Sequence, residues 1–145
     1  MENLLISACL LGVDCRYDGN NNLIKGLEEL KARYNLIPVC PEILGGMATP
    51  RKPVELKSGH VFNQDGQNFD REFFNGAAQS VKIARICDCH KALLQARSPS
   101  CGYGLIYDGT FSRTLIPGNG IAAESLEQAG LEIYSSDDIA GLLDI

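Results

Sequence analysis

Four of the six cysteines lie in three short motifs, and each motif follows an apolar segment. The first motif contains Cys9 and Cys15, the second contains Cys40 and the third contains Cys101. The motifs are far apart in the sequence, but a parallel sheet gathers the carboxyl ends of its strands at one edge, where ligands bind. Thiols that meet in a reducing compartment indicate a metal or an iron–sulfur cluster more than a disulfide. The pattern therefore predicts a thiol-lined metal or cluster site.

Each of these cysteines taken alone could instead be a small buried apolar residue, a common role of free cysteine. Turn-forming neighbours such as Pro41 and Gly102 place the thiols where the backbone bends rather than inside a strand. Cys15 lies six residues after Cys9, in a loop, and is either a fourth ligand or a bystander. Three protein ligands would leave an open position for a substrate, whereas four would suit electron transfer or a structural role.

Polar residues in the same motifs are candidates for proton transfer. Glu42 lies two residues after Cys40 and could be a general acid or base; the alternative is a solvated glutamate at a turn. Ser98 and Ser100 flank Pro99. Either hydroxyl could hold a water or a substrate atom, and either could simply form the turn.

Further candidates for substrate binding are basic side chains and a glycine-rich turn. Arg16 and Arg51 could hold an anionic or carbonyl group, although surface salt bridges are the commoner role of arginine. The turn Gly118-Asn119-Gly120 precedes a predicted helix and offers free backbone N–H groups at its positive end. It lacks the full dinucleotide or P-loop pattern. We therefore expect Arg16, Gly118 and Asn119 to contact substrate, together with Ser100.

The remaining two cysteines form the segment Cys87-Asp88-Cys89-His90. A lone motif of this kind is a weak metal signal. It lies between a predicted helix and the strand that follows, so it belongs to the opposite edge of the sheet. We expect a structural role for it.

The elements that must position these residues alternate along the chain. Continuous apolar runs predict strands over 4–8, 36–40, 92–96 and 131–134. Helical spacing predicts helices over 23–34, 70–87 and 121–129, and a last helix capped by Asp137 that runs to Asp144. Turn residues predict hairpins over 54–63 and within 103–117. We therefore expect an α/β fold: a mostly parallel open sheet with helices on both faces, in a Rossmann-like three-layer arrangement with a small β-hairpin insertion, as one domain over 1–145.

Composition restricts the partners. The net charge is −5, from 13 basic and 18 acidic residues, which argues against binding to a nucleic-acid backbone. No apolar run approaches the roughly 20 residues of a membrane-spanning helix, and the first residues do not resemble a signal peptide. We expect a cytoplasmic protein that acts on a small molecule.

Together the three motifs resemble a bacterial family catalogued as domain-of-unknown-function family five-two-three, over nearly the whole chain. The resemblance rests on Ser7-Ala8-Cys9-Leu10-Leu11-Gly12, Cys15-Arg16-Tyr17-Asp18-Gly19, Cys40-Pro41-Glu42, Gly45-Gly46, Thr49-Pro50-Arg51 and Ser98-Pro99-Ser100-Cys101-Gly102. Members of this family include thiouracil desulfidases, which carry a [4Fe–4S] cluster held by only three cysteines. The resemblance thus implies a cluster-dependent desulfidase.

The implied reaction is a desulfuration without redox change. The thiocarbonyl sulfur of a thiolated pyrimidine would bind the unique iron, a water would attack the carbon, and sulfide would leave on the iron, which acts as a Lewis acid. The resemblance assigns the ligands Cys9, Cys40 and Cys101, the acid–base residue Glu42, and Ser98 as the residue that positions water or substrate. Cys15 matches the family pattern as well as Cys9 does.

Two other functions fit the same residues. One is a non-catalytic metal- or cluster-binding module for sensing or sulfur trafficking, in which Glu42 and Ser98 would be dispensable but Cys101 would not. The other is a plain α/β domain whose cysteines are buried and inert.

Overall fold

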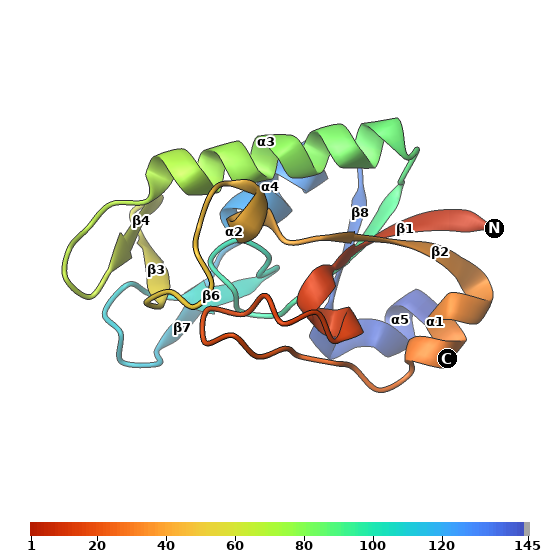
Figure 1. Cartoon of the computed structure of the whole chain (residues 1–145), viewed down its shortest axis with the longest axis horizontal. Coiled ribbons are helices and arrows are strands. Elements are labelled where there is room, and N and C mark those ends of the chain that lie inside the picture. The colour runs from red at the N-terminus through yellow and green to blue at the C-terminus, as the bar shows by residue number, and fades with distance from the viewer. Residues whose placement is uncertain (144–145) are drawn as a thin grey trace.

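A four-stranded parallel sheet forms the centre of the computed structural model, which describes residues 1–143 (Figure 1). The strand order is β2-β1-β5-β8, and every neighbouring pair is parallel. The strands are β1 (Glu2–Ser7), β2 (Tyr34–Val39), β5 (Lys91–Leu94) and β8 (Glu132–Ser135). The predicted α/β fold with an open parallel sheet is confirmed.

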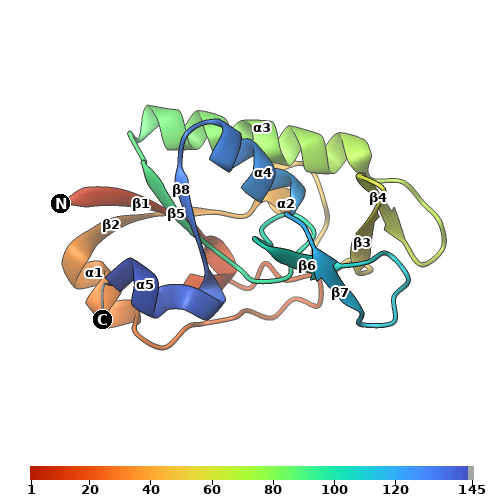
Figure 2. The ribbon, with the colours of Figure 1, turned by 180° about the vertical axis from the view of Figure 1, so that it is seen from behind.

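Helices cover both faces of this sheet. They are α1 (Leu27–Arg33), α2 (Pro41–Leu44), α3 (Asp70–Ile86), α4 (Ile121–Gln128) and α5 (Ile139–Leu143). Side chains alternate across a strand, so Leu5 packs in the cluster under α3 and α4, whereas Leu4 and Ile6 pack in the cluster under α1 and α5. Figures 1 and 2 show these two helix pairs on opposite sides of the sheet. Of the helices in residues 1–143, none combines the length and apolar character needed to cross a bilayer.

Two antiparallel hairpins extend from the sheet, in the two stretches where turn residues predicted them. Their strands are β3 (Val54–Lys57) with β4 (His60–Asn63), and β6 (Leu105–Tyr107) with β7 (Leu115–Pro117). Val61 and Ile106 of the hairpins form a third apolar cluster with Phe73 of α3. The β3–β4 hairpin is therefore anchored to the amino-terminal end of α3, as Figure 2 shows, and β6 packs beside β3.

The prediction of a helix over 23–34 is wrong at both ends. Gly26 has a left-handed backbone, with φ of 89°, and α1 begins only after it. Before Gly26 the chain runs alongside the first motif, where the Ile24 N–H donates to the Leu10 carbonyl. Tyr34 already belongs to β2, paired in register with Glu2 of β1. Tertiary pairing thus overrides the helical spacing of the apolar residues.

The end of the chain also differs from the prediction. A 3₁₀ turn, η2 (Ser136–Asp138), comes before α5. Its cap is Ser135, whose hydroxyl accepts from the Asp137 N–H, so Asp137 is not the cap. Asp144 lies outside the described residues, and the single domain over 1–145 stays a prediction.

The strand order reverses between β1 and β5, and this places the cysteine motifs together. From β1 the chain moves outward to β2 on one side, and later fills β5 and β8 on the other. Ser7 lies beside Val39, and Ile6 lies beside Leu93, so the three strands end at one level. A 3₁₀ helix, η1 (Ala8–Leu11), follows β1, and α2 follows β2. Ligand sites of open α/β sheets lie at such reversals.

Helix α2 is held by backbone contact with α3. A Cβ atom added at Gly76 would lie 1.9 Å from the Pro41 carbonyl oxygen, and one at Gly45 would lie 1.8 Å from the Glu72 carbonyl oxygen. Two helices can approach this closely only where both lack side chains. The short helix that carries Glu42 is therefore positioned by two glycines.

We predict that Gly76→Ala lowers the free energy of unfolding by about 2 kcal/mol through overpacking. Helix propensity alone would act in the opposite direction, by about 1 kcal/mol. Urea unfolding of the cluster-free, reduced protein measures the change. The matched control is Ala78→Gly, at an exposed position of the same helix, which should cost only the propensity difference. An equally stable or more stable Gly76→Ala protein would contradict the close contact.

Candidate metal or cluster site

The four cysteines of the three motifs converge at the carboxyl edge of the sheet. Cys9 lies in η1, Cys40 is the N-cap of α2, and Cys101 lies in the loop after β5. Burial, followed by the neighbouring Cys40 thiol, raises the pKa of Cys15 to about 12. Burial is also the main cause that raises the pKa of Cys101, with the thiols of Cys9 and Cys40 adding to it. The structure thus brings together all four of these predicted residues.

The chemistry of these thiols suits an iron–sulfur cluster, because thiolates are the usual ligands of such clusters. Among the side chains of residues 1–143, no group of three or more Cys, His, Asp or Glu is placed to hold a single metal ion. Because the pKa values of Cys9, Cys15 and Cys101 are raised, binding would displace protons from them.

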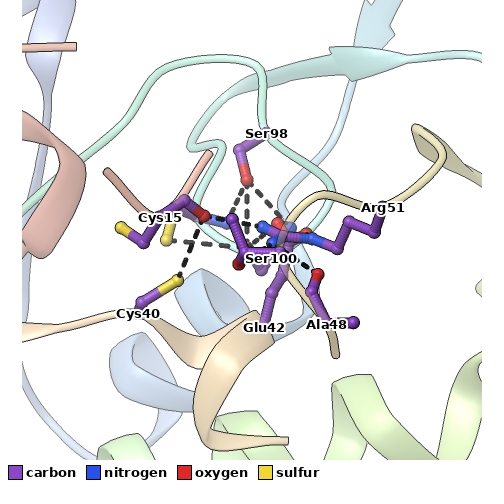
Figure 3. A network of polar contacts seen from close by, with 9 residues as sticks. Cys15, Cys40, Glu42, Ala48, Arg51, Ser98 and Ser100 are labelled. Carbon is purple, nitrogen blue, oxygen red and sulfur yellow. Dashed lines mark hydrogen bonds and ion pairs between the residues drawn. The ribbon is translucent and has the colours of Figure 1, made fainter. Parts of the chain in front are cut away.

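Glu42 stands beside the thiols and is held from both sides (Figure 3). Its Oε1 accepts from Arg51 Nε at 3.1 Å, and its Oε2 accepts from the Ser100 hydroxyl at 2.9 Å. Only 14% of its side chain is exposed, so the alternative of a solvated glutamate is wrong. Figure 3 shows the Cys15 and Cys40 sulfurs on the side of this network away from Arg51. A carboxylate lies next to the cluster of thiols, as the motif predicted.

The two serines form a directed chain of hydroxyls. The Ser100 hydroxyl has one proton, and its nearer acceptor is Glu42 Oε2 at 2.9 Å rather than the Cys101 sulfur at 3.7 Å. With that proton given to Glu42, the 3.0 Å contact between the serine oxygens uses the proton of Ser98. Ser98 Oγ also accepts from the N–H groups of Ser100 and Cys101. Its one donor and two acceptor sites are therefore all in use. Ser100, with acceptor capacity left, is the hydroxyl that touches Glu42.

The loop that contains Cys101 is seated on the start of α4. Gly120 donates its N–H to the Gly102 carbonyl, and the first residues of α4 donate to the carbonyls of Pro99 and Ser100. The N–H groups of Gly118 and Gly120 are therefore paired, contrary to the expectation of free N–H groups along Gly118-Asn119-Gly120. Gly118 donates to the Gly104 carbonyl, and the Asn119 side chain bonds to the Gly104 N–H and to Glu124. This turn holds the Cys101 loop instead of offering an anion site.

Two other sequence candidates lie apart from the network. The Arg16 guanidinium bonds to Asp18 and Asn22 within its own loop, so the structure does not bring it against Glu42. The Cys87-Asp88-Cys89-His90 segment connects α3 to β5 at the opposite edge, as expected. There the Cys87 carbonyl accepts from the Asn3 side chain.

Sequence reasoning missed one residue of the site, Ser7, and did not predict the contact that another, Arg51, makes with Glu42. Arg51 was a substrate-binding candidate whose commoner alternative was a surface salt bridge, yet 7% of its side chain is exposed and it pairs with Glu42. Ser7, at the end of β1, is buried and hydrogen-bonds both the Gln95 N–H and the Cys101 thiol. Both residues lie inside the quoted motifs, which was the only available signal.

Similarity to known proteins extends over nearly the whole chain. Residues 4–138 match the model of the 2-thiouracil desulfurase family. Uncharacterized protein YbbK of Bacillus subtilis (strain 168) is 33% identical over 150 residues, which cover 97% of this chain and 99% of that protein. The solved structure of the [4Fe–4S]-dependent thiouracil desulfidase TudS superposes with a TM-score of 0.93 at 36% identity, covering 98% of this chain and 95% of that one.

We predict that Gly120→Ala disrupts the packing of the Cys101 loop against the start of α4. A Cβ atom there would lie 2.5 Å from the Ser100 carbonyl carbon and 2.9 Å from the Cys101 nitrogen, so the free energy of unfolding should fall by about 2 kcal/mol. The control is Gly118→Ala, whose Cβ would meet only the movable end of Ile106. Urea unfolding of both variants measures the change. If both lose the same free energy of unfolding, the close contact between Gly120 and the Cys101 loop does not explain the loss.

Proposed function

The chain belongs to the 2-thiouracil desulfurase family, and we propose that it is an iron–sulfur-dependent desulfidase acting on a small thiolated pyrimidine. The observation that carries the proposal is the convergence of four thiols beside a largely buried carboxylate at the reversal of strand order. The similarity to TudS, described as [4Fe–4S]-dependent, supports the cofactor and the substrate class. The net charge of −5 fits a small ligand rather than a nucleic-acid strand.

Cys9, Cys40 and Cys101 would hold the [4Fe–4S] cluster. Cys9 in η1 and Cys40 at the N-cap of α2 lie next to the ends of their strands, and Cys101 lies in the loop after β5, which supports these three as the ligands. Cys15 is the fourth thiol, near Cys40, and we assign it no ligand role. When bound, such a cluster supplies a Lewis-acidic iron with affinity for a thiocarbonyl sulfur.

Glu42 would act as the general base. Each of its oxygens has one hydrogen-bond partner, so each keeps acceptor capacity with which to orient a water and take its proton. Ser100 holds Oε2 and is the hydroxyl nearest to this chemistry. Ser98 would position Ser100 and the Cys101 loop, and the Ser100 hydroxyl would exchange its proton with Oε2.

The ligand assignment predicts which serine variants lose the cluster. After anaerobic reconstitution, Cys9→Ser, Cys40→Ser and Cys101→Ser should lose most bound iron and acid-labile sulfide, because each removes one of three thiolate ligands. Cys15→Ser should retain both. Cys87→Ser, at the opposite edge of the sheet, is the control. If Cys15→Ser loses the cluster while Cys9→Ser keeps it, Cys15 is the ligand of the first motif.

The catalytic assignment is tested by sulfide release from 2-thiouracil under anaerobic conditions. Glu42→Gln keeps the size of the side chain but removes the base, so the rate should fall by about 100-fold or more at unchanged iron content. A reconstituted wild-type protein that releases no sulfide from any thiolated base would contradict the proposed desulfidase activity. It would favour the non-catalytic cluster-binding module instead.

A further inference from the structure

Arg51 makes the densest set of polar contacts around the candidate site. Its guanidinium donates to Glu42 Oε1 at 3.1 Å, to Thr49 Oγ1 at 3.0 Å, and to the carbonyls of Ala48 at 3.1 Å and Cys15 at 2.9 Å. Its own N–H donates to the Tyr17 carbonyl at 2.7 Å. These acceptors come from the first cysteine motif, from α2 and from the loop after α2. One buried side chain therefore joins segments that are separate in the sequence.

The contact with Glu42 restrains one of the two carboxylate oxygens. Arg51 holds Oε1, while Ser100 holds Oε2 from the other side of the site. With both oxygens restrained, the plane of the carboxylate and its unused lone pairs have one orientation. A base that is already oriented does not have to reorganise when it takes a proton.

The contacts with Cys15 and Tyr17 restrain the loop of the first motif. The Cys15 carbonyl accepts from Arg51 and also lies 4.0 Å from the Cys40 sulfur. The same guanidinium thus links the orientation of Glu42 to the loop that borders the thiols. Figure 3 shows Arg51 reaching Glu42 and the Cys15 carbonyl together.

We infer that Arg51 is the positioning residue of the desulfidase reaction: it aligns Glu42 and restrains the Cys15 loop without touching the substrate. The inference rests on the proposed function. Only a planar guanidinium can donate in these several fixed directions at once, whereas the ammonium of lysine is a compact charge on a flexible stem. Arg51→Lys therefore keeps the charge and removes the geometry.

The experiment compares Arg51→Lys, Glu42→Gln and the double variant with the wild type, all reconstituted anaerobically and assayed with 2-thiouracil. Arg51→Lys should keep the iron content, leave KM within about twofold and lower kcat by about 10- to 100-fold. If Arg51 acts through Glu42, the double variant should be no slower than Glu42→Gln alone, within about threefold. The control is Lys52→Met, which changes the next residue, an exposed partner of Asp65, and should leave kcat unchanged.

A second measurement does not depend on the cluster. Hydrogen exchange of the cluster-free protein should be about tenfold faster over 13–20 in Arg51→Lys than in the wild type, and unchanged in Lys52→Met.

The outcomes separate the two hypotheses. A wild type that turns over together with an Arg51→Lys variant of equal kcat would overturn the inference alone. The same holds if kcat falls only in proportion to lost iron, or if the two single effects multiply in the double variant. A wild type with no sulfide release would overturn the proposed function and the inference with it.

Discussion

The parallel pairing of β1 with both β2 and β5 is the constraint on which the rest of the structure depends. These pairs end at one level, so the segments that follow them start at one edge of the sheet. Because β1 lies at the reversal of strand order, the end of β1 lies between the segments that follow β2 and β5, and its Ser7 hydroxyl accepts from the Gln95 N–H just after β5. The three cysteine motifs therefore meet without any long-range signal in their own sequences.

A polar network beside apolar thiols must satisfy its hydrogen bonds, because an unpaired charge in a desolvated site is costly. Here no buried side-chain nitrogen or oxygen in residues 1–143 lacks a partner. Arg51 and Ser100 each take one oxygen of Glu42, and Ser98 is saturated by two N–H groups and one hydroxyl. The network can hold a carboxylate near the thiols because every group in it is paired.

Close backbone contacts complete the positioning. Helix α2 rests on α3 through Gly45 and Gly76, and the Cys101 loop rests on α4 at Gly120. These contacts leave no space for a Cβ atom, so the segments of Cys40 and Cys101, which follow the strands on either side of β1, have little freedom to shift. Rigid support of this kind is what a site needs when its reacting groups come from distant parts of a chain.

The sequence predicted the elements with strong periodicity. The apolar run of β1, the long helix α3 and the helix α4 lie where their patterns indicated, because burial on a sheet requires those patterns. The segment over 23–34 does not form the single helix that its pattern indicated. Its apolar residues belong first to an irregular stretch, then to a short helix and finally to the start of β2. Helical spacing cannot distinguish these uses, and strand pairing with β1 decides between them.

For the site, the residue types and strand direction alone predicted that Cys9, Cys40 and Cys101 meet near Glu42. Their motifs carry that information locally, because a turn after a buried strand has only one edge of the sheet to face. What only the tertiary structure decided is which polar groups touch. Arg51 pairs with Glu42 rather than with solvent, Ser100 rather than Ser98 contacts the carboxylate, and Gly118 and Asn119 support a loop. Such contacts depend on distances between segments that are remote in sequence, and no local pattern encodes those distances.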